Sequence, residues 1–310
     1  MERRHEAGEH GDLTIRLIDL MKHFPHVQRG EGEHRYGDQQ HQEPYGGTEP
    51  RSRGERERAQ DGEDDKRRGL EVDTEDQFLA FLRALRLPPF QDVFIAGGEH
   101  AEIEALLSVL STGPVGVGDR LGRADAEIVR RTCRADGVLV KPDFPIAAVD
   151  RAFLQHGVAR PEPLIAETAS AHTAGTWTYV LTINAFRQGD PVTSRVDLRD
   201  VGVTEPVVAF DWRAGTAEPL DPGGGWDVAL PAAGWDYRLL APLRDDVAVI
   251  GDANLFAPAG DMRIGDVDGR RVTVLGAPGE RVTLTVWDGE LRTIDVDVPD
   301  RGWLAVDVRR

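Results

Sequence analysis

The stretch that decides the fold lies in the middle of the chain, Ser111–Asp150, STGPVGVGDRLGRADAEIVRRTCRADGVLVKPDFPIAAVD. Near its start, Val115 and Val117 stand between glycines, a pattern typical of a buried parallel strand that other backbone approaches closely. Residues 124–133 then predict a helix with apolar side chains inward and arginines outward. After Asp136–Gly137 the apolar residues repeat every second position. The stretch therefore predicts a strand and a helix that lead into an all-β domain.

Two amphipathic segments stand before this stretch. The first, FLAFLRALRL at 78–87, has apolar side chains at helical spacing and stops at Pro88–Pro89, which ends helices. Residues 91–95 predict a short strand, and HAEIEALLSVL at 100–110 predicts a second helix. Helices that alternate with short strands are typical of a TIM-type βα barrel.

Beyond residue 137 the chain predicts many short strands separated by turn signals such as Asp268–Gly269, Pro278–Gly279 and Asp288–Gly289. Such spacing favours an antiparallel β-sandwich. The predicted strands are 138–140, 176–183, 195–198, 207–211, 226–230, 237–240, 247–250, 271–275, 282–287, 293–298 and 303–308. The fold class is thus α/β plus all-β, with the last barrel elements at 71–136 and the sandwich at 137–310.

Residues 1–70 differ from the rest and predict a disordered tail. Residues 29–69 hold almost no aliphatic side chains, so they cannot bury enough apolar surface to offset the entropy of ordering. A short helix is expected only at 13–24. Six of the nine histidines fall in this tail, but their spacing matches no compact ligand motif, so no metal site is predicted. Two interpretations stay open: a solvated tail, or translation from a misplaced start codon.

Composition excludes several classes of function. The formal net charge is −17, and no basic stripe with interleaved aromatic residues is present, so a nucleic-acid partner is not expected. No apolar run reaches the ~20 residues of a membrane span, and the N-terminus has no secretory signal pattern. Cys133, the single cysteine, excludes an internal disulfide and is expected to pack as a helix thiol. A cytoplasmic protein is the expectation.

Three segments carry a family resemblance: GPVGVGDRLG at 113–122, RADGVLVKPD at 134–143, and FDWRAGTAEPLDPGGGWDVALPAAGWDYRLLAP at 210–242. They resemble the last barrel strand, the barrel-to-sandwich link and the C-terminal strands of the raffinose synthase and seed imbibition protein group of α-galactosidase-like glycoside hydrolases (family 36-like). The resemblance begins near Phe78, so most of the family's catalytic barrel has no counterpart here. It implies hydrolysis or transfer of α-galactosyl groups, without metal or organic cofactor.

The resemblance also implies a retaining mechanism with a nucleophile and an acid/base carboxylate about 5–5.5 Å apart. Both family motifs would stand before residue 78. The acidic cluster Asp61–Asp65 follows no apolar strand, so no catalytic residue is assigned. The expectation is a C-terminal fragment that is inactive alone, whose partner would be a separately encoded barrel half.

Asp92 and Asp119 are the candidate substrate-binding residues, because the resemblance places both where barrel strands end. The competing interpretation is that Asp92 caps a turn and Asp119 caps the following helix. Glu99 and His100 resemble a family Glu-x-His step, but a position at a helix start is the favoured explanation. An active glycosidase that uses Asp92, Asp119 or Glu99 as its carboxylate pair is the less favoured alternative.

The tryptophans support a function of another class, a non-catalytic carbohydrate-binding or structural sandwich. All six lie beyond residue 170, and exposed indoles can stack on sugar rings. Four or five are expected in the core of the sandwich. Trp212, Trp226 and Trp235 flank glycine-rich turns, so any exposed tryptophan is expected among these three. Gly223–Gly225 is not a phosphate loop, since no Gly-Lys-Ser/Thr step and no helix are expected there.

Overall fold

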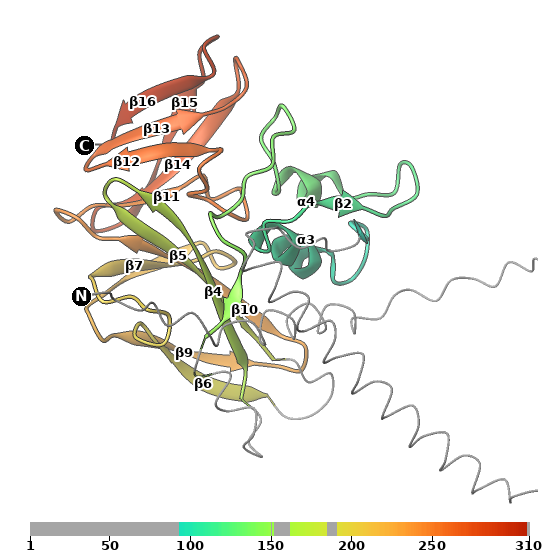
Figure 1. The fold of residues 1–310 in the computed structure, drawn as a ribbon, viewed down its shortest axis with the longest axis vertical. Coiled ribbons are helices and arrows are strands. Elements are labelled where there is room, and N and C mark those ends of the chain that lie inside the picture. Colours follow the sequence, from blue (N-terminus) through green and yellow to red (C-terminus); the bar gives the residue numbers. More distant parts are fainter. Residues whose placement is uncertain (1–92, 150, 152–161, 185–190, 309–310) are drawn as a thin grey trace, which may run out of the picture.

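The computed structural model describes residues 93–149, 151, 162–184 and 191–308 (Figure 1). This part of the chain is mostly antiparallel β-sheet, with two short helices near its beginning. The predicted tail at 1–70 with its helix at 13–24, the helix at 78–87, and Asp92 lie outside the described residues. Those expectations stay predictions.

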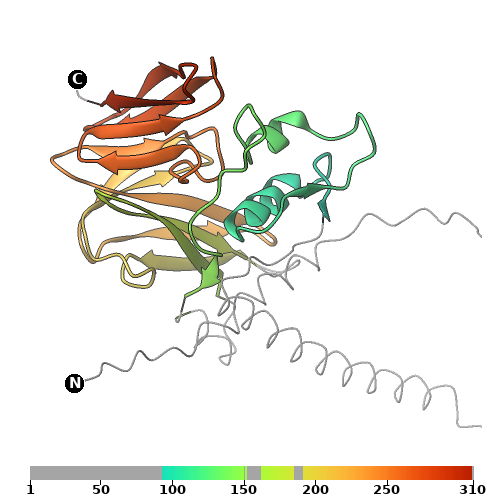
Figure 2. The same ribbon diagram turned by 45° about the horizontal axis from the view of Figure 1, so that its top comes forward.

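A small helical segment opens the described chain. Its elements are β1 (Val93–Phe94), α3 (Ala101–Leu110), β2 (Gly116–Val117) and α4 (Ala126–Arg130). Eight of the ten residues of α3 are buried, and the two that are not are Glu102 and Glu104 in its first turn. Helix α4 is shorter than predicted and has no fully buried residue. Figures 1 and 2 show this segment on one side of the stacked sheets.

The largest sheet has six strands in the order β3-β4-β5-β10-β7-β8, and all its neighbours are antiparallel. Its long central strands β4, β5 and β10 pair over most of their length. The strands are β3 (Ala147–Ala148), β4 (Leu164–His172), β5 (Gly175–Ile183), β10 (Trp235–Pro242), β7 (Val207–Asp211) and β8 (Thr216–Leu220).

Three smaller antiparallel sheets complete the fold, in the orders β11-β14-β15, β12-β13-β16 and β6-β9. In Figure 1 the two three-stranded sheets lie at one end of the molecule and the β6-β9 pair at the other. The strands are β11 (Ala248–Gly251), β14 (Arg281–Trp287), β15 (Leu291–Asp297), β12 (Ile264–Asp268), β13 (Arg271–Leu275), β16 (Trp303–Asp307), β6 (Val192–Asp197) and β9 (Gly225–Leu230).

Both faces of the six-stranded sheet are buried. Because side chains alternate along a strand, Tyr179 and Leu181 of β5 face the larger hydrophobic core, while Val180 faces the smaller one. The larger core also contains α3 and the inner residues of the three-stranded sheets. The smaller core is closed by Trp226 and Val228 of β9. The sheet is therefore the central layer of the molecule.

The predicted all-β region is confirmed as antiparallel sheets, and ten of the eleven predicted strands correspond to observed ones. The strand predicted at 138–140 is wrong, because Leu139 makes only an isolated bridge to Cys133. Strands β3, β4, β8 and β12 were not predicted. The origin of residues 93–136 as the end of a barrel, and the boundaries at 70 and 136, stay predictions.

A buried arginine ties several of these elements together. Arg263 is 2% exposed; its Nε lies 3.2 Å from Asp252 Oδ2, and its guanidinium also pairs with Glu280. Arg263 Nη1 donates to the carbonyl of Leu275 at 2.9 Å. Glu280 in turn accepts from the backbone N–H of Ala277 and, at 3.2 Å, of Ala135. The cluster thus joins β11, β13 and β14 to the segment that leaves α4.

We expect Arg263→Ala to destabilise the fold by about 3–5 kcal/mol, because it leaves the buried carboxylate of Asp252 and the partly buried one of Glu280 without a countercharge. Urea unfolding followed by tryptophan fluorescence measures the change. The matched control is Arg281→Ala, which removes an ion pair to Asp295 whose side chains are 67% and 50% exposed. That pair is expected to contribute less than about 1 kcal/mol. Equal losses in the two variants would contradict this account of the cluster.

Candidate functional site

The candidate site lies at the end of a parallel βαβ unit. Strands β1 and β2 pair in parallel, with Val93 opposite Gly116 and Phe94 opposite Val117, and α3 connects them. A Cβ on Gly116 would lie 2.9 Å from Val93 Cγ1, and one on Gly118 would lie 2.7 Å from Val93 Cγ2. The glycines therefore permit the close approach that the sequence predicted.

Asp119 follows β2 at its carboxyl end, and its carboxylate is held by backbone. Its Oδ2 accepts the N–H of Ala96 at 2.6 Å, and its Oδ1 accepts the N–H of Gly97 at 3.0 Å. Both donors belong to the loop that follows β1. A Cβ on Gly97 would lie 3.2 Å from Asp119 Oδ1 and 2.8 Å from the Arg123 carbonyl, so this glycine also permits a close approach. The carboxylate therefore ties together the two loops that follow the parallel strands.

This arrangement corrects one of the two interpretations of Asp119. The residue does not cap the following helix: Asp125 is the N-cap of α4, and its Oδ1 accepts the N–H of Glu127 at 2.8 Å. The role of Asp119 in substrate binding stays a prediction. Glu99 and His100 come directly before α3, in the position expected of residues at a helix start.

The tryptophans are distributed differently from the prediction. Trp226 is 4% exposed and lies in the smaller core, so its predicted exposure is wrong. Trp212 and Trp235 are half-buried and pack against the larger core. Trp303 is the large exposed one, at 43%, and Arg301 lies over its ring at 4.2 Å. Among the tryptophans, Trp303 is therefore the most exposed candidate for stacking with a sugar ring.

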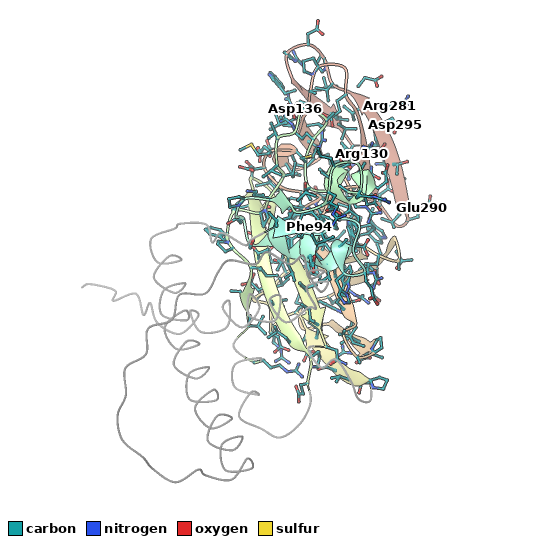
Figure 3. The ribbon with its side chains drawn as sticks, turned by 90° about the vertical axis from the view of Figure 1, so that its right-hand side faces the viewer. Phe94, Arg130, Asp136, Arg281, Glu290 and Asp295 are labelled. Atoms are coloured by element: carbon teal, nitrogen blue, oxygen red, sulfur yellow. The ribbon has the colours of Figure 1, made fainter. Side chains whose placement is uncertain are left out.

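A cavity of about 600 Å³ lies where the helical segment meets the sheets. Figure 3 looks onto the side of the molecule that carries the helices and labels Arg130 there. The lining residues come from α3, α4, the turn after β7 and the loop after β11: Glu102, Glu127, Arg130, Arg131, Trp212, Arg213, Ala253 and Asn254. Except for Trp212, the sequence singled out none of these residues for a site.

Within the described ranges, no group of three or more His, Cys, Asp or Glu side chains is arranged to hold a metal ion. The histidines of the N-terminal tail lie outside those ranges. Over the same residues, no helix has the length and apolar character needed to cross a membrane. Cys133 is a free thiol one turn beyond α4, with Sγ 3.7 Å from the Val129 carbonyl oxygen.

Comparison with known proteins finds partial likeness among solved structures. One is a GH27 β-L-arabinopyranosidase from Geobacillus stearothermophilus, with 15% identity and a TM-score of 0.33, covering 47% of this chain and 31% of that one. Another is a putative α-N-acetylgalactosaminidase from Bacillus halodurans, with 15% identity and a TM-score of 0.33, covering 46% and 30%. A third is α-galactosidase I from Mortierella vinacea, with 9% identity and a TM-score of 0.32, covering 46% and 36%.

This chain therefore spans about a third of the length of each of these enzymes. No protein-family model matches the chain. No curated protein matches it either. What the chain does has to follow from its own residues.

Replacing Asp119 by Asn is expected to weaken the link between the β1 and β2 loops. An amide offers one acceptor oxygen and turns a donor toward one of the two backbone N–H groups, at a cost of about 1–2 kcal/mol. Hydrogen exchange at Ala96 and Gly97 should then become faster. The matched control is Asp125→Asn, since asparagine caps a helix as well as aspartate does. Unchanged exchange at Ala96 and Gly97 in Asp119→Asn would contradict this role.

Proposed function

We propose that this chain is a glycoside hydrolase-like protein of the α-galactosidase type, and that residues 93–308 support the catalytic barrel of such an enzyme. The observation that carries the proposal is the order of the elements. A parallel βαβ unit is followed without a break in the fold by antiparallel sheets that share its hydrophobic core. Parallel strands joined by helices belong to barrels and doubly wound folds, whereas antiparallel strands build sandwiches.

Two further observations support this assignment. The segment that resembles the family's last barrel strand, 113–122, contains β2, and β2 is paired in parallel with the preceding strand as barrel strands are. The segment that resembles the barrel-to-sandwich link, 134–143, runs from the end of the helical part to the six-stranded sheet. There Asp143 Oδ2 accepts the N–H of Ala171 in β4 at 2.8 Å.

In this proposal the chain does not cleave the glycosidic bond alone. The carboxylate of Asp119 already accepts two backbone N–H groups, so it serves to position loops. A retaining enzyme requires a nucleophile and an acid/base on opposite sides of the bond. A separately encoded barrel half would supply both, and its strands would continue the parallel pair. The substrate class would be α-galactosides, with hydrolysis or transfer as the reaction.

The test is turnover of a nitrophenyl α-galactoside. The purified chain alone should give no turnover above background, and co-expression with the product of the adjacent upstream reading frame should give turnover. Within that complex, Asp119→Asn should lower the melting temperature and leave kcat nearly unchanged. Turnover by the chain alone that Asp92→Asn or Asp119→Asn abolishes would show instead that this chain carries its own catalytic carboxylates. No turnover from either preparation would count against the proposal.

A further inference from the structure

The cavity between the helical segment and the sheets carries an excess of positive charge. Three guanidinium groups line it, from Arg130, Arg131 and Arg213, against the carboxylates of Glu102 and Glu127. The chain as a whole has a formal net charge of −17. The lining therefore has one more positive than negative side chain, and a local positive surplus in so acidic a protein favours the binding of a negative group.

The guanidinium groups of two of these arginines lie over aromatic rings. The Arg131 guanidinium lies 5.0 Å from the ring centroid of Trp212, and that of Arg213 lies 4.2 Å from the centroid of Trp235. Trp212 is itself fixed, because its Nε1 donates to the carbonyl of Leu255 at 2.9 Å. A guanidinium that is held over a ring still has N–H donors for a ligand, and it loses little rotamer entropy when it binds one.

One carboxylate serves both stacked arginines. Glu102 Oε1 lies 2.7 Å from Arg131 Nη1, and Glu102 Oε2 lies 3.8 Å from Arg213 Nε. A single negative charge therefore fixes two guanidinium groups and neutralises only one of them. The third arginine, Arg130, pairs with Glu127 at the rim, where the side chains are 67% and 75% exposed, so that pair contributes little and can open.

We propose that this cavity binds a small ligand that carries a carboxylate or phosphate beside hydroxyl groups. The edges of Arg131 and Arg213 receive the anion, because the guanidinium fork matches both groups. Asn254 and Glu127 on the lining are the partners for hydroxyl groups. A volume of about 600 Å³ accommodates a monosaccharide derivative or a molecule of similar size. The inference does not rest on the proposed glycosidase relation.

The test titrates the full chain at low ionic strength with four probes: galacturonate, galactose 1-phosphate, inorganic phosphate and neutral galactose. Calorimetry gives the affinity, and the indole N–H signal of Trp212 in NMR reports on the cavity. At least one of the two charged sugars should bind at least about tenfold more tightly than galactose, with the Trp212 signal shifting, and added salt should weaken that binding. Galacturonate and galactose 1-phosphate distinguish a carboxylate ligand from a phosphate ligand, and inorganic phosphate shows whether the anion suffices alone.

Variants locate the site. Arg213→Gln should weaken the binding of the charged sugar at least about tenfold, because a charge-assisted hydrogen bond is lost. The matched control is Arg195→Gln: both side chains are half exposed, 51% for Arg213 and 50% for Arg195, and both belong to surface ion pairs. Arg195 lies outside the cavity lining, so its variant should bind like the parent chain. Thermal unfolding establishes that each variant is folded.

Three results would overturn the proposal: no binding of either charged sugar, binding of galactose as tight as that of the charged sugars, or an equal loss in the Arg195→Gln variant.

Discussion

The buried ion cluster around Arg263 is the interaction on which the arrangement of the sheets and the helical segment depends. Arg263 and Asp252 are 2% and 5% exposed, so their charges have little contact with water. Burial raises the pKa of Asp252. For Glu280, burial acts in the same direction, but hydrogen bonds from Arg263 and the Ala277 backbone hold its pKa below the usual value. Burying these charges costs desolvation free energy, and separating them while they stay buried costs more. The fold in which β11, β13 and β14 bring the charges together is therefore strongly preferred.

The helical segment is attached to the sheets by contacts of two kinds. Apolar residues of α3 belong to the same core as Trp177 and Tyr237 of the six-stranded sheet. Polar contacts then set the geometry: Lys141 Nζ donates to the carbonyls of Thr112 and Gly113, and the N–H of Phe256 donates to the carbonyl of Arg131. Burial lowers the pKa of Lys141, as expected where the partners of the ammonium group are carbonyls rather than carboxylates. Of these anchors, the Phe256–Arg131 hydrogen bond fixes the backbone at a residue that lines the cavity.

Asp119 and the arginines of the cavity illustrate two uses of charge. The charge of Asp119 has a structural use, since both oxygens of its carboxylate accept hydrogen bonds from backbone N–H groups. Arg131 and Arg213 are positioned by the rings of Trp212 and Trp235 and by Glu102. A guanidinium group has five N–H donors, so these contacts leave donors for a ligand. A residue of the first kind affects the loops it joins, whereas residues of the second kind remain able to bind a ligand.

The sequence by itself determined where most strands lie and which helix is buried. Alternation of apolar residues located β9, β13 and β14, because period two is imposed by the pleat. The alternation did not reveal β4, because polar residues occupy core positions there. Thr168 is buried and donates to the Phe144 carbonyl, and Ser170 is buried and hydrogen-bonds to the Tyr179 hydroxyl. The alternation also did not reveal β8, a polar edge strand.

Only the tertiary structure decided which residues meet at Asp119 and in the arginine-lined cavity. It turned Asp119 toward the loop after β1, which no local pattern around residue 119 encodes. It also brought together four separate segments to form the arginine-lined cavity. Local sequence specifies the spacing of side chains along one element. Which charges and rings meet across elements depends on how the sheets stack, and that stacking is set by the shared core and the buried ion cluster.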